Sequence, residues 1–240
     1  MIRFILVEPL HPNNIGSTAR AMKTMGITSL YLVNPRFFPS PAAHAMASGA
    51  DDILDNAVVV TSLQEALADC ELIFATSDRD DNVVRFPKLD VREAAIKAHN
   101  AQTQGLNIAF VFGTESIGLS NDQMKFAHYH VRIPTATDFS SLNLSQAVQV
   151  IAYELLMATA SPTPSGDTAS EPANHTETER FYMRFEELLR QVEFLKPGHD
   201  KIILQKLRRL FQRAKLEKNE VIIMQGIISN ILRHLNLKDH

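Results

Sequence analysis

The sequence contains a single cysteine, Cys70, among its 240 residues, so no disulfide can form within the chain. Long apolar runs are also lacking. The first one, Phe4–Val7, is interrupted by Glu8 and falls far below the length of a signal peptide or a membrane-spanning helix. Because neither secretion nor a membrane segment is indicated, we expect a cytoplasmic protein.

Several common catalytic signatures are absent or incomplete. The segment Gly113–Ser120 has the glycine spacing of a phosphate-binding loop, but Leu119 occupies the position of its lysine. The dinucleotide glycine pattern and the Gly-x-Ser-x-Gly elbow do not occur. The nine histidines lack metal-ligand spacing, although His128 and His130 share one side of a predicted strand. We expect no metal site, and a dinucleotide-dependent dehydrogenase is only a distant alternative.

The net charge of −3 argues against a nucleic-acid partner, but the charge is unevenly distributed. Residues 1–160 carry 11 Lys and Arg against 16 Asp and Glu, whereas residues 177–240 carry 13 against 9. Such asymmetry favours a separate binding surface in the C-terminal part. A solvated helical face that happens to be basic explains the charge equally well.

Residues 161–176 are rich in Pro, Ser and Thr and contain no large apolar side chain. A segment of this kind cannot bury enough surface to offset the entropy lost on ordering, so it predicts a flexible linker. It separates a first domain, 1–160, from a second domain, 177–240. The second domain has three helical patterns with short connections, at 179–195, 200–216 and 218–235, and these predict a small bundle.

The first domain alternates strand and helix patterns, which predicts an α/β fold with a mostly parallel sheet covered on both faces. The predicted strands are 3–9, 29–35, 58–60, 71–77, 107–113 and 128–134, and the predicted helices are 13–26, 62–70 and 144–160. For the first helix we expect an N-cap at Asn13 or Asn14 and a stop at Gly26.

Arg20 lies within this first helix. Ile15, Ala19 and Met22 repeat at helical spacing and form its expected buried stripe, while Gly16, Arg20 and Lys23 fall on an adjacent face. Periodicity alone therefore leaves Arg20 as a surface residue.

Small polar residues follow three of the predicted strands, at Thr76–Ser77, Gly113–Glu115 and Thr135–Ser145. Ligands collect at the carboxyl ends of strands in a parallel sheet. Backbone amides and hydroxyls there suit a polar, adenosine-like ligand better than a polyphosphate held by lysine. In Ser140–Ser145 one residue would suffice as a helix cap, so the others can line a pocket, although capping alone is an open alternative.

Taken together, three motifs resemble those of the SPOUT superfamily of S-adenosylmethionine-dependent RNA methyltransferases, in its 2′-O-ribose branch. They are NNIGSTARAMKTMG at 13–26, FVFGTESIGLSN at 110–121 and IPTATDFSSLNLSQAVQVIAYEL at 133–155. The tail KLRRLFQRA resembles one bacterial subgroup, the tRNA (cytidine/uridine-2′-O-)-methyltransferase J type, which modifies nucleotide 32 in the anticodon loop.

The resemblance implies a sheet with a C-terminal trefoil knot, which the ordinary rules of chain connection would not predict. It also implies a homodimer, tRNA as substrate and S-adenosylmethionine as cofactor, converted to S-adenosylhomocysteine, with no metal. Methylation of another RNA, such as rRNA, and a non-catalytic RNA-binding relative are the alternatives. Because every matched chemical position is filled, we favour the enzyme.

The resemblance also assigns the site residues. The implied catalytic positions are Asn14, Arg20, Glu115, Ser141 and Asn143, and the implied cofactor contacts are Thr76, Ser77, Asp78, Gly113, Ile133, Ser140, Ser141 and Leu142. The loop after Ser77 departs from the subgroup, because it keeps Arg79 but has Asp81 where a second basic residue is usual.

In the family, Arg20 of one subunit lies beside the pocket of the other. A guanidinium stays protonated and is a poor base, so we expect Arg20 to bind a phosphate and stabilise the developing alkoxide. Ser141 would orient the ribose or pass on its proton. The predicted RNA contacts are Arg20, Lys23, Arg79, Lys206, Arg208, Arg209 and Arg213, and Lys201 and Lys215 extend this basic cluster.

Overall fold

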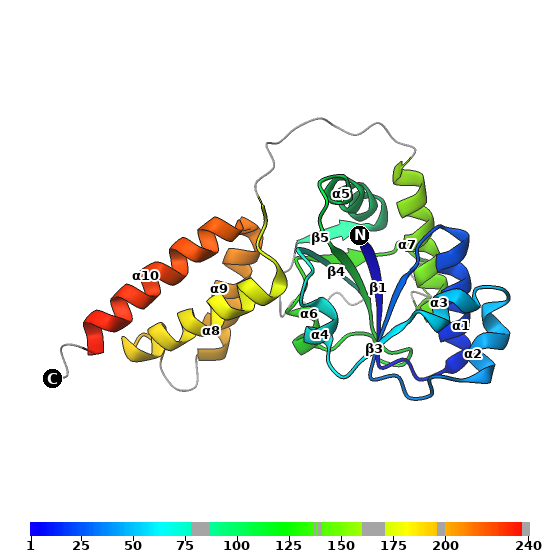
Figure 1. Cartoon of the computed structure of the whole chain (residues 1–240), viewed down its shortest axis with the longest axis horizontal. Coiled ribbons are helices and arrows are strands. Elements are labelled where there is room, and N and C mark those ends of the chain that lie inside the picture. The colour runs from blue at the N-terminus through cyan, green and yellow to red at the C-terminus, as the bar shows by residue number, and fades with distance from the viewer. Residues whose placement is uncertain (78–86, 137, 139–140, 160–170, 196–199, 237–240) are drawn as a thin grey trace. The chain divides into compact units, whose positions relative to one another are not determined.

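The computed structural model describes residues 1–77, 87–136, 138, 141–159, 171–195 and 200–236. The chain divides into two compact units, Met1–Gly166 and Asp167–His240 (Figure 1). The N-terminal unit contains a parallel sheet with helices, and the described part of the C-terminal unit is helical. Each unit has its own cluster of buried apolar side chains.

The sheet of the N-terminal unit is parallel throughout, with the strand order β3-β2-β1-β6-β4-β7-β5. The strands are β1 (Ile2–Val7), β2 (Ser29–Val33), β3 (Val58–Val60), β4 (Leu72–Thr76), β5 (Lys88–Asp90), β6 (Ile108–Phe112) and β7 (Tyr129–Arg132). The predicted α/β class is therefore confirmed, and six strands lie where the sequence predicts them. The trefoil knot stays a prediction.

Helices cover both faces of the sheet (Figure 1). Phe4 and Leu6 of β1 pack on one face and Ile5 and Val7 on the other, as the alternation of side chains along a strand requires. The first face is covered by α1 (Pro12–Thr24), α2 (Pro41–Ala47), α3 (Asp51–Asp55), α5 (Val91–Thr103) and α7 (Leu144–Thr159). The second face is covered by α4 (Leu63–Leu67) and the region of α6 (Asn121–Met124).

The start of α1 differs from the prediction. Its N-cap is His11, without a side-chain cap, and Pro12 occupies the first turn, so the predicted cap at Asn13 or Asn14 is wrong. Proline suits this position because its fixed φ is helical and its missing N–H would have no partner there. The stop at Gly26 is confirmed, since Gly26 has a φ of 73° just beyond the C-cap residue.

The face of α1 that carries Gly16 is also different from expectation. Ile15, Ala19 and Met22 are buried as predicted, but Gly16 is buried too, against α2. A Cβ at Gly16 would lie 2.0 Å from the carbonyl oxygen of Ala43. The glycine therefore permits close packing of α1 on α2.

The C-terminal unit contains α8 (His175–Gln191), α9 (Asp200–Ala214) and α10 (Lys218–Asn236), as the three helical patterns predict. Its buried cluster includes Phe181, Leu188, Val221 and Ile228. Phe181 meets Phe211 edge to face, with 4.8 Å between the ring centroids. Among the described residues, no helix is long and apolar enough to cross a membrane.

The end of the predicted linker, 161–176, belongs to this helical unit. Ala173 is buried, and its N–H donates to the Leu216 carbonyl. Asn174 caps α8 in a reciprocal capping box, with its side chain accepting from the N–H of Glu177. The described end of the segment therefore contains a helix cap, whereas residues 161–170 of the predicted linker lie outside the described residues and stay a prediction.

Candidate active site

A cavity of about 240 Å³ opens at the carboxyl ends of β4, β6 and β7. Its lining residues are Thr76, Ser77, Phe112, Gly113, Thr114, Glu115, Ser116, Ile117, Gly118, Val131, Ile133, Thr135, Ser141, Leu142, Leu144 and Ala147. Hydroxyls and backbone groups alternate with apolar side chains, and no lysine or arginine is found among the described residues that line the cavity. Such a surface suits a small ligand with both an apolar ring and hydrogen-bonding groups.

The cavity gathers many of the predicted cofactor contacts. Thr76, Ser77, Gly113, Ile133, Ser141 and Leu142 all line it, and so does the predicted catalytic residue Glu115. Asp78, Arg79, Asp81 and Ser140 lie outside the described residues. Three predicted catalytic residues do not line the cavity: Asn14, Arg20 and Asn143.

The loop after β6 forms one wall of the cavity. Thr114 and Gly118 exchange two backbone hydrogen bonds of 3.3 and 3.0 Å, which close a tight turn. A Cβ at Gly113 would lie 2.1 to 2.4 Å from backbone atoms of Gly118 and Leu119, so only glycine permits this close approach. Leu119, which replaces the lysine of a phosphate-binding loop, is buried in the core beneath the sheet.

His128 and His130, for which the sequence indicates no metal site, form hydrogen bonds to β4 and to the residue that follows it. The His130 ring is within 2.8 Å of the Ser77 carbonyl, to which its Nε2–H donates. His128 Nδ1 accepts from the N–H of Ile73 at 3.0 Å. His130 thereby fixes the backbone at a cavity-lining residue. The alternation of the two histidines with buried strand residues was the available signal, but it did not distinguish a positioning role from a metal ligand.

Glu115 connects the cavity wall to the start of α1. Its carboxylate accepts from the N–H groups of Leu10 at 2.8 Å and His11 at 3.1 Å, and from the Asn14 amide at 2.9 Å. Glu115 thus satisfies amides at the helix start from another loop. A carboxylate at this end also interacts favourably with the helix dipole.

Asn14 extends the same network to α7. The Asn143 amide donates to Asn14 Oδ1 at 3.0 Å, and Asn143 Oδ1 accepts from the N–H and hydroxyl of Ser145. Asn143 consequently acts in the capping role that the sequence proposed for this segment. The three predicted catalytic residues Asn14, Glu115 and Asn143 join the three motif loops by side-chain hydrogen bonds.

The environment of Glu115 alters its acidity. Burial by itself would raise the pKa of the Glu115 carboxyl, but the hydrogen bonds from Asn14, Leu10 and His11 outweigh it, and the net effect lowers the pKa. Glu115 is therefore ionised at neutral pH. An ionised carboxylate can accept from all three donors, which is what the network requires.

The two predicted RNA-contacting cations of α1 differ in their surroundings. Arg20 is exposed, and no ion pair to it occurs among the described residues. Lys23 instead pairs with Asp52 at 2.7 Å and donates to the Gly49 carbonyl at 2.9 Å. The sequence could not reveal this pairing because Asp52 lies in α3. Arg20 remains the available cation on this helix.

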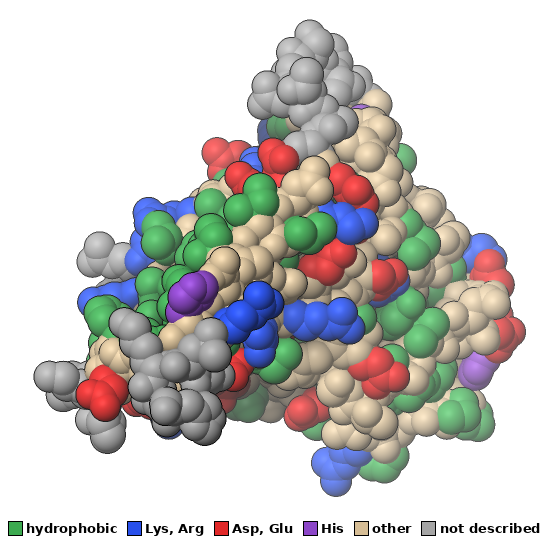
Figure 2. Space-filling view, turned by 60° about the vertical axis from the view of Figure 1, so that its left-hand side comes forward, with side chains coloured by type: hydrophobic (Ala, Val, Ile, Leu, Met, Phe, Trp, Pro, Cys, Tyr) green, Lys and Arg blue, Asp and Glu red, His purple; other side chains and the backbone are tan. Residues whose placement is uncertain are grey.

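The basic cluster of the C-terminal unit also contains both ion-paired and unpaired cations. Arg208 forms an ion pair with Glu179, and its guanidinium lies 4.4 Å from the centre of the Tyr182 ring, so it contributes to the bundle rather than to a free surface. Arg209 is only partly exposed. Within the cluster, the exposed cations that have no ion pair in the described structure are Lys201, Lys206, Arg213 and Lys215. Figure 2, which turns the left-hand side of Figure 1 forward, shows basic, acidic and hydrophobic side chains mixed on that face.

Within the described part of the chain, no group of three or more His, Cys, Asp or Glu side chains is placed to hold a metal ion. Among the described lining residues, the groups that can form polar contacts are hydroxyls, backbone amides and the Glu115 carboxylate. Groups of this kind can bind and orient a ligand through hydrogen bonds.

Comparison with known proteins relates this cavity to one family. The SpoU rRNA Methylase family model matches residues 1–153, and the model of the C-terminal domain of tRNA methyltransferase TrmJ matches residues 176–240. The tRNA (cytidine/uridine-2'-O-)-methyltransferase TrmJ of Salmonella typhimurium is 45% identical over 238 residues, which cover 96% of each chain.

Solved structures agree with these matches. The crystal structure of TrmJ from Z. mobilis ZM4 has a TM-score of 0.84 and 33% identity, and the match covers 96% of this chain and 99% of that one. The SpoU methyltransferase AviRb from Streptomyces viridochromogenes, solved in complex with the cofactor AdoMet, shares the fold at a TM-score of 0.54 and 23% identity, over 67% and 60% of the two chains. The chain belongs to the SpoU rRNA methylase family.

Proposed function

We propose that this protein is an S-adenosylmethionine-dependent tRNA methyltransferase that modifies the ribose 2′-oxygen of cytidine or uridine at nucleotide 32. The supporting observation is the cavity at the carboxyl ends of β4, β6 and β7, which contains six of the positions expected to contact the cofactor. The identity of 45% to a tRNA 2′-O-methyltransferase over nearly the whole chain supports the substrate. With tRNA as substrate, the expected compartment is the cytoplasm.

The residues of the cavity fit S-adenosylmethionine. Three apolar side chains provide contacts for an adenine ring: Ile133 just after β7, Leu142 just before α7 and Leu144 at the start of α7. The hydroxyls of Ser77, Thr135 and Ser141 provide hydrogen bonds for a ribose and an amino acid, and Gly113 permits close approach of the backbone. When bound, S-adenosylmethionine supplies a methyl group activated for direct displacement.

The chain's own residues then align the acceptor. Ser141 lies in the cavity wall and orients the ribose through its hydroxyl. The hydrogen-bonded chain of Glu115, Asn14 and Asn143 fixes the three loops relative to one another, so that a ribose bound among them is held in one orientation. Arg20 binds the adjacent phosphate and stabilises negative charge on the 2′-oxygen as its proton passes, through the Ser141 hydroxyl, to solvent water.

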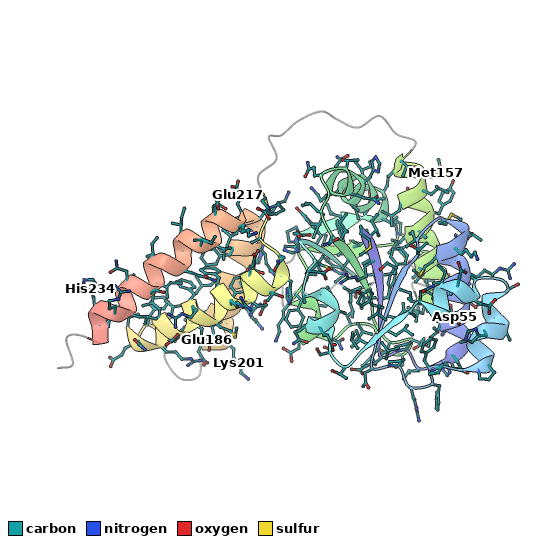
Figure 3. All side chains as sticks on the ribbon, in the orientation of Figure 1. Asp55, Met157, Glu186, Lys201, Glu217 and His234 are labelled. Carbon is teal, nitrogen blue, oxygen red and sulfur yellow. The ribbon has the colours of Figure 1, made fainter. Side chains whose placement is uncertain are left out.

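Arg20 does not line the cavity of its own chain, which is why we propose a homodimer in which each subunit supplies Arg20 to the other. An exposed apolar face on α7, the helix that packs against α1, supports this arrangement. It is formed by Tyr153, Leu156 and Met157, of which Met157 is labelled in Figure 3. Residues at this spacing lie on one side of a helix and suit a symmetric contact.

A methylation assay tests the proposed function. The purified protein is incubated with methyl-labelled S-adenosylmethionine and either unmodified tRNA or fragments of rRNA, and the labelled nucleotide is mapped. We expect 2′-O-methylcytidine or 2′-O-methyluridine at nucleotide 32 of tRNA. Labelling of rRNA alone would assign the protein to another substrate, and binding without any transfer would identify a non-catalytic relative.

A further inference from the structure

The loop between β2 and α2 exposes an aromatic ring. Phe37 is 53% exposed, whereas Phe4, Phe74 and Phe110 are fully buried in the core. Within the described residues of the N-terminal unit, it is the one phenylalanine on the surface. Single exposed apolar side chains are common on protein surfaces, so this ring is informative only through the backbone and the charge that surround it.

The loop holds this ring in a defined place. On one side of Phe37, the N–H of Asn34 donates to the Val60 carbonyl at 2.9 Å, and the N–H of Arg36 donates to the Pro9 carbonyl at 3.3 Å. On the other side, Phe38 packs against the core and the Ser40 side chain caps α2. The surface ring is therefore carried by an anchored backbone, which reduces the entropy lost when a ligand binds.

A free cation accompanies the ring. The Arg36 guanidinium carbon lies 5.2 Å from the centre of the Phe37 ring, and Arg36 is exposed with no ion pair in the described structure. An exposed aromatic ring beside an unpaired guanidinium can bind a nucleotide by two complementary contacts. The ring stacks on the base, and the guanidinium binds the phosphate.

The position of the loop relates it to the proposed active site. Within the sheet only β1 lies between β2 and β6, so the carboxyl ends of β2 and β6 are about 10 Å apart at the usual strand spacing. Pro9, which accepts from Arg36, directly precedes Leu10, whose N–H donates to Glu115 in the cavity wall. The loop that carries Phe37 therefore follows a strand whose carboxyl end lies at the same edge of the sheet as the cavity.

We propose that Phe37 and Arg36 form a binding platform for one unpaired nucleotide of the RNA substrate, close to the nucleotide that is methylated. Phe37 stacks on the base and Arg36 binds its phosphate. The platform reads no base edge, so it tolerates different bases at that position. This inference rests on the proposed function.

Substitution in the full-length protein tests the platform. Phe37→Ala is expected to lower the affinity for tRNA by about 5- to 100-fold, the effect measured when a stacking ring is removed, whereas Phe37→Tyr keeps the ring and the affinity. Arg36→Gln is expected to weaken binding and to reduce the slope of log affinity against log salt by about one. Calorimetry with S-adenosylmethionine is expected to give unchanged cofactor affinity in all three variants.

A fluorescent variant reports stacking directly. The chain contains no tryptophan, so Phe37→Trp introduces a single reporter. Addition of tRNA is expected to quench its emission, with saturation at the concentration that saturates binding. Ile96→Trp, at an exposed position on α5, is the matched control and should not be quenched.

Two results would overturn the platform. One is unchanged tRNA affinity in Phe37→Ala together with unquenched Phe37→Trp. The other is a change of oligomeric state in Phe37→Ala on sedimentation, which would identify the ring as a contact between subunits. Assays of the wild-type protein distinguish failure of the platform proposal from failure of the proposed function. If wild type methylates tRNA while the variants behave as wild type, only the platform is wrong, and if wild type neither binds nor methylates tRNA, both proposals fail.

Discussion

At the residue scale, Glu115 shows how one side chain can serve a site mainly by positioning others. Its carboxylate accepts three hydrogen bonds from Leu10, His11 and Asn14, and so anchors the helix that carries Arg20. Sequence comparison suggests that Glu115 is functional but gives no role for it. The structure indicates that the role requires an ionised carboxylate, both of whose oxygens accept hydrogen bonds.

We expect Glu115→Gln to lower the free energy of unfolding at pH 7 by about 1 kcal/mol, because an amide NH₂ cannot accept from these donors. The lowered pKa of the Glu115 carboxyl sets the pH dependence. A carboxyl that is more acidic in the folded state stabilises the fold above its ordinary pKa, near 4.5, and loses that contribution as the pH falls through the folded value.

Urea unfolding of both proteins at several pH values measures this effect. The difference between wild type and Glu115→Gln should be largest at neutral pH and shrink below about pH 4.5. A difference that stays constant down to pH 3.5 would show that ionisation of Glu115 does not matter to the network.

At the element scale, the packing of α1 on α2 depends on Gly16. Because a Cβ at this position would lie 2.0 Å from the Ala43 carbonyl oxygen, Gly16→Ala must separate the two helices. The cost of overpacking, about 1 to 3 kcal/mol, exceeds the gain of up to about 1 kcal/mol from alanine's higher helix propensity. We expect a net loss of stability in thermal unfolding and reduced methylation, since Arg20 lies one turn further along.

Gly226 offers a matched control for this substitution. It also lies inside a helix, α10, but a Cβ there would meet nothing within 4 Å. Gly226→Ala is therefore expected to leave stability unchanged or raise it. Equal destabilisation by both substitutions would refute the packing argument.

Six strands, α1, α7 and the helices of the C-terminal unit follow from the sequence because apolar runs and helical spacing determine them locally. The 13-residue helix α5 was not predicted, since its buried face consists of Val91 and small alanines, which give a weak apolar pattern. Strands such as Ile108–Phe112 are continuous apolar segments, and α7 is a long apolar helix. The short β5, Lys88–Asp90, was not predicted, because a polar three-residue strand exists only through its pairing with β7. The same holds for α2, whose helical turn depends on contact with α1.

The resemblance predicted which residues belong to the candidate site, but not the hydrogen bonds that connect them. The resemblance named Asn14, Glu115 and Asn143 as functional, whereas their hydrogen-bonded chain spans more than a hundred residues of sequence and cannot be read from local patterns. Lys23 and Arg208 stay predicted RNA contacts, but the sequence could not reveal that each pairs with a carboxylate on another helix. His130 was considered as a metal ligand, and its bond to the Ser77 carbonyl gives it a positioning role.

At the scale of the whole molecule, the exposed cations of α9 are expected to contribute to tRNA affinity. Lys206 and Arg213 are seven residues apart and so lie on one face of the helix. Charge reversal of both in the full chain should weaken tRNA binding and lower its salt slope by about two, because two phosphate contacts are lost. Reversal of Arg233 on α10 is the control, and equal loss in the control would indicate a general charge effect.

The proposed homodimer makes a distinctive prediction for mixed subunits. Arg20→Ala removes the residue supplied to the partner, while Gly113→Ala disturbs the cavity wall of its own chain. Each variant alone should be inactive. Random mixing gives about half heterodimers with one intact site each, so activity should recover to about a quarter of wild type. Absence of recovery despite subunit exchange would place both residues in one chain's site.

The central claim is that the ribose 2′-hydroxyl at tRNA nucleotide 32 is the methyl acceptor. It is tested most directly by comparing two synthetic tRNAs that differ only in having a 2′-hydroxyl or a 2′-hydrogen at that nucleotide, with transfer of label measured in a single turnover. The account predicts transfer to the first tRNA and none to the second, with both bound equally well. Equal labelling of the two tRNAs would contradict it.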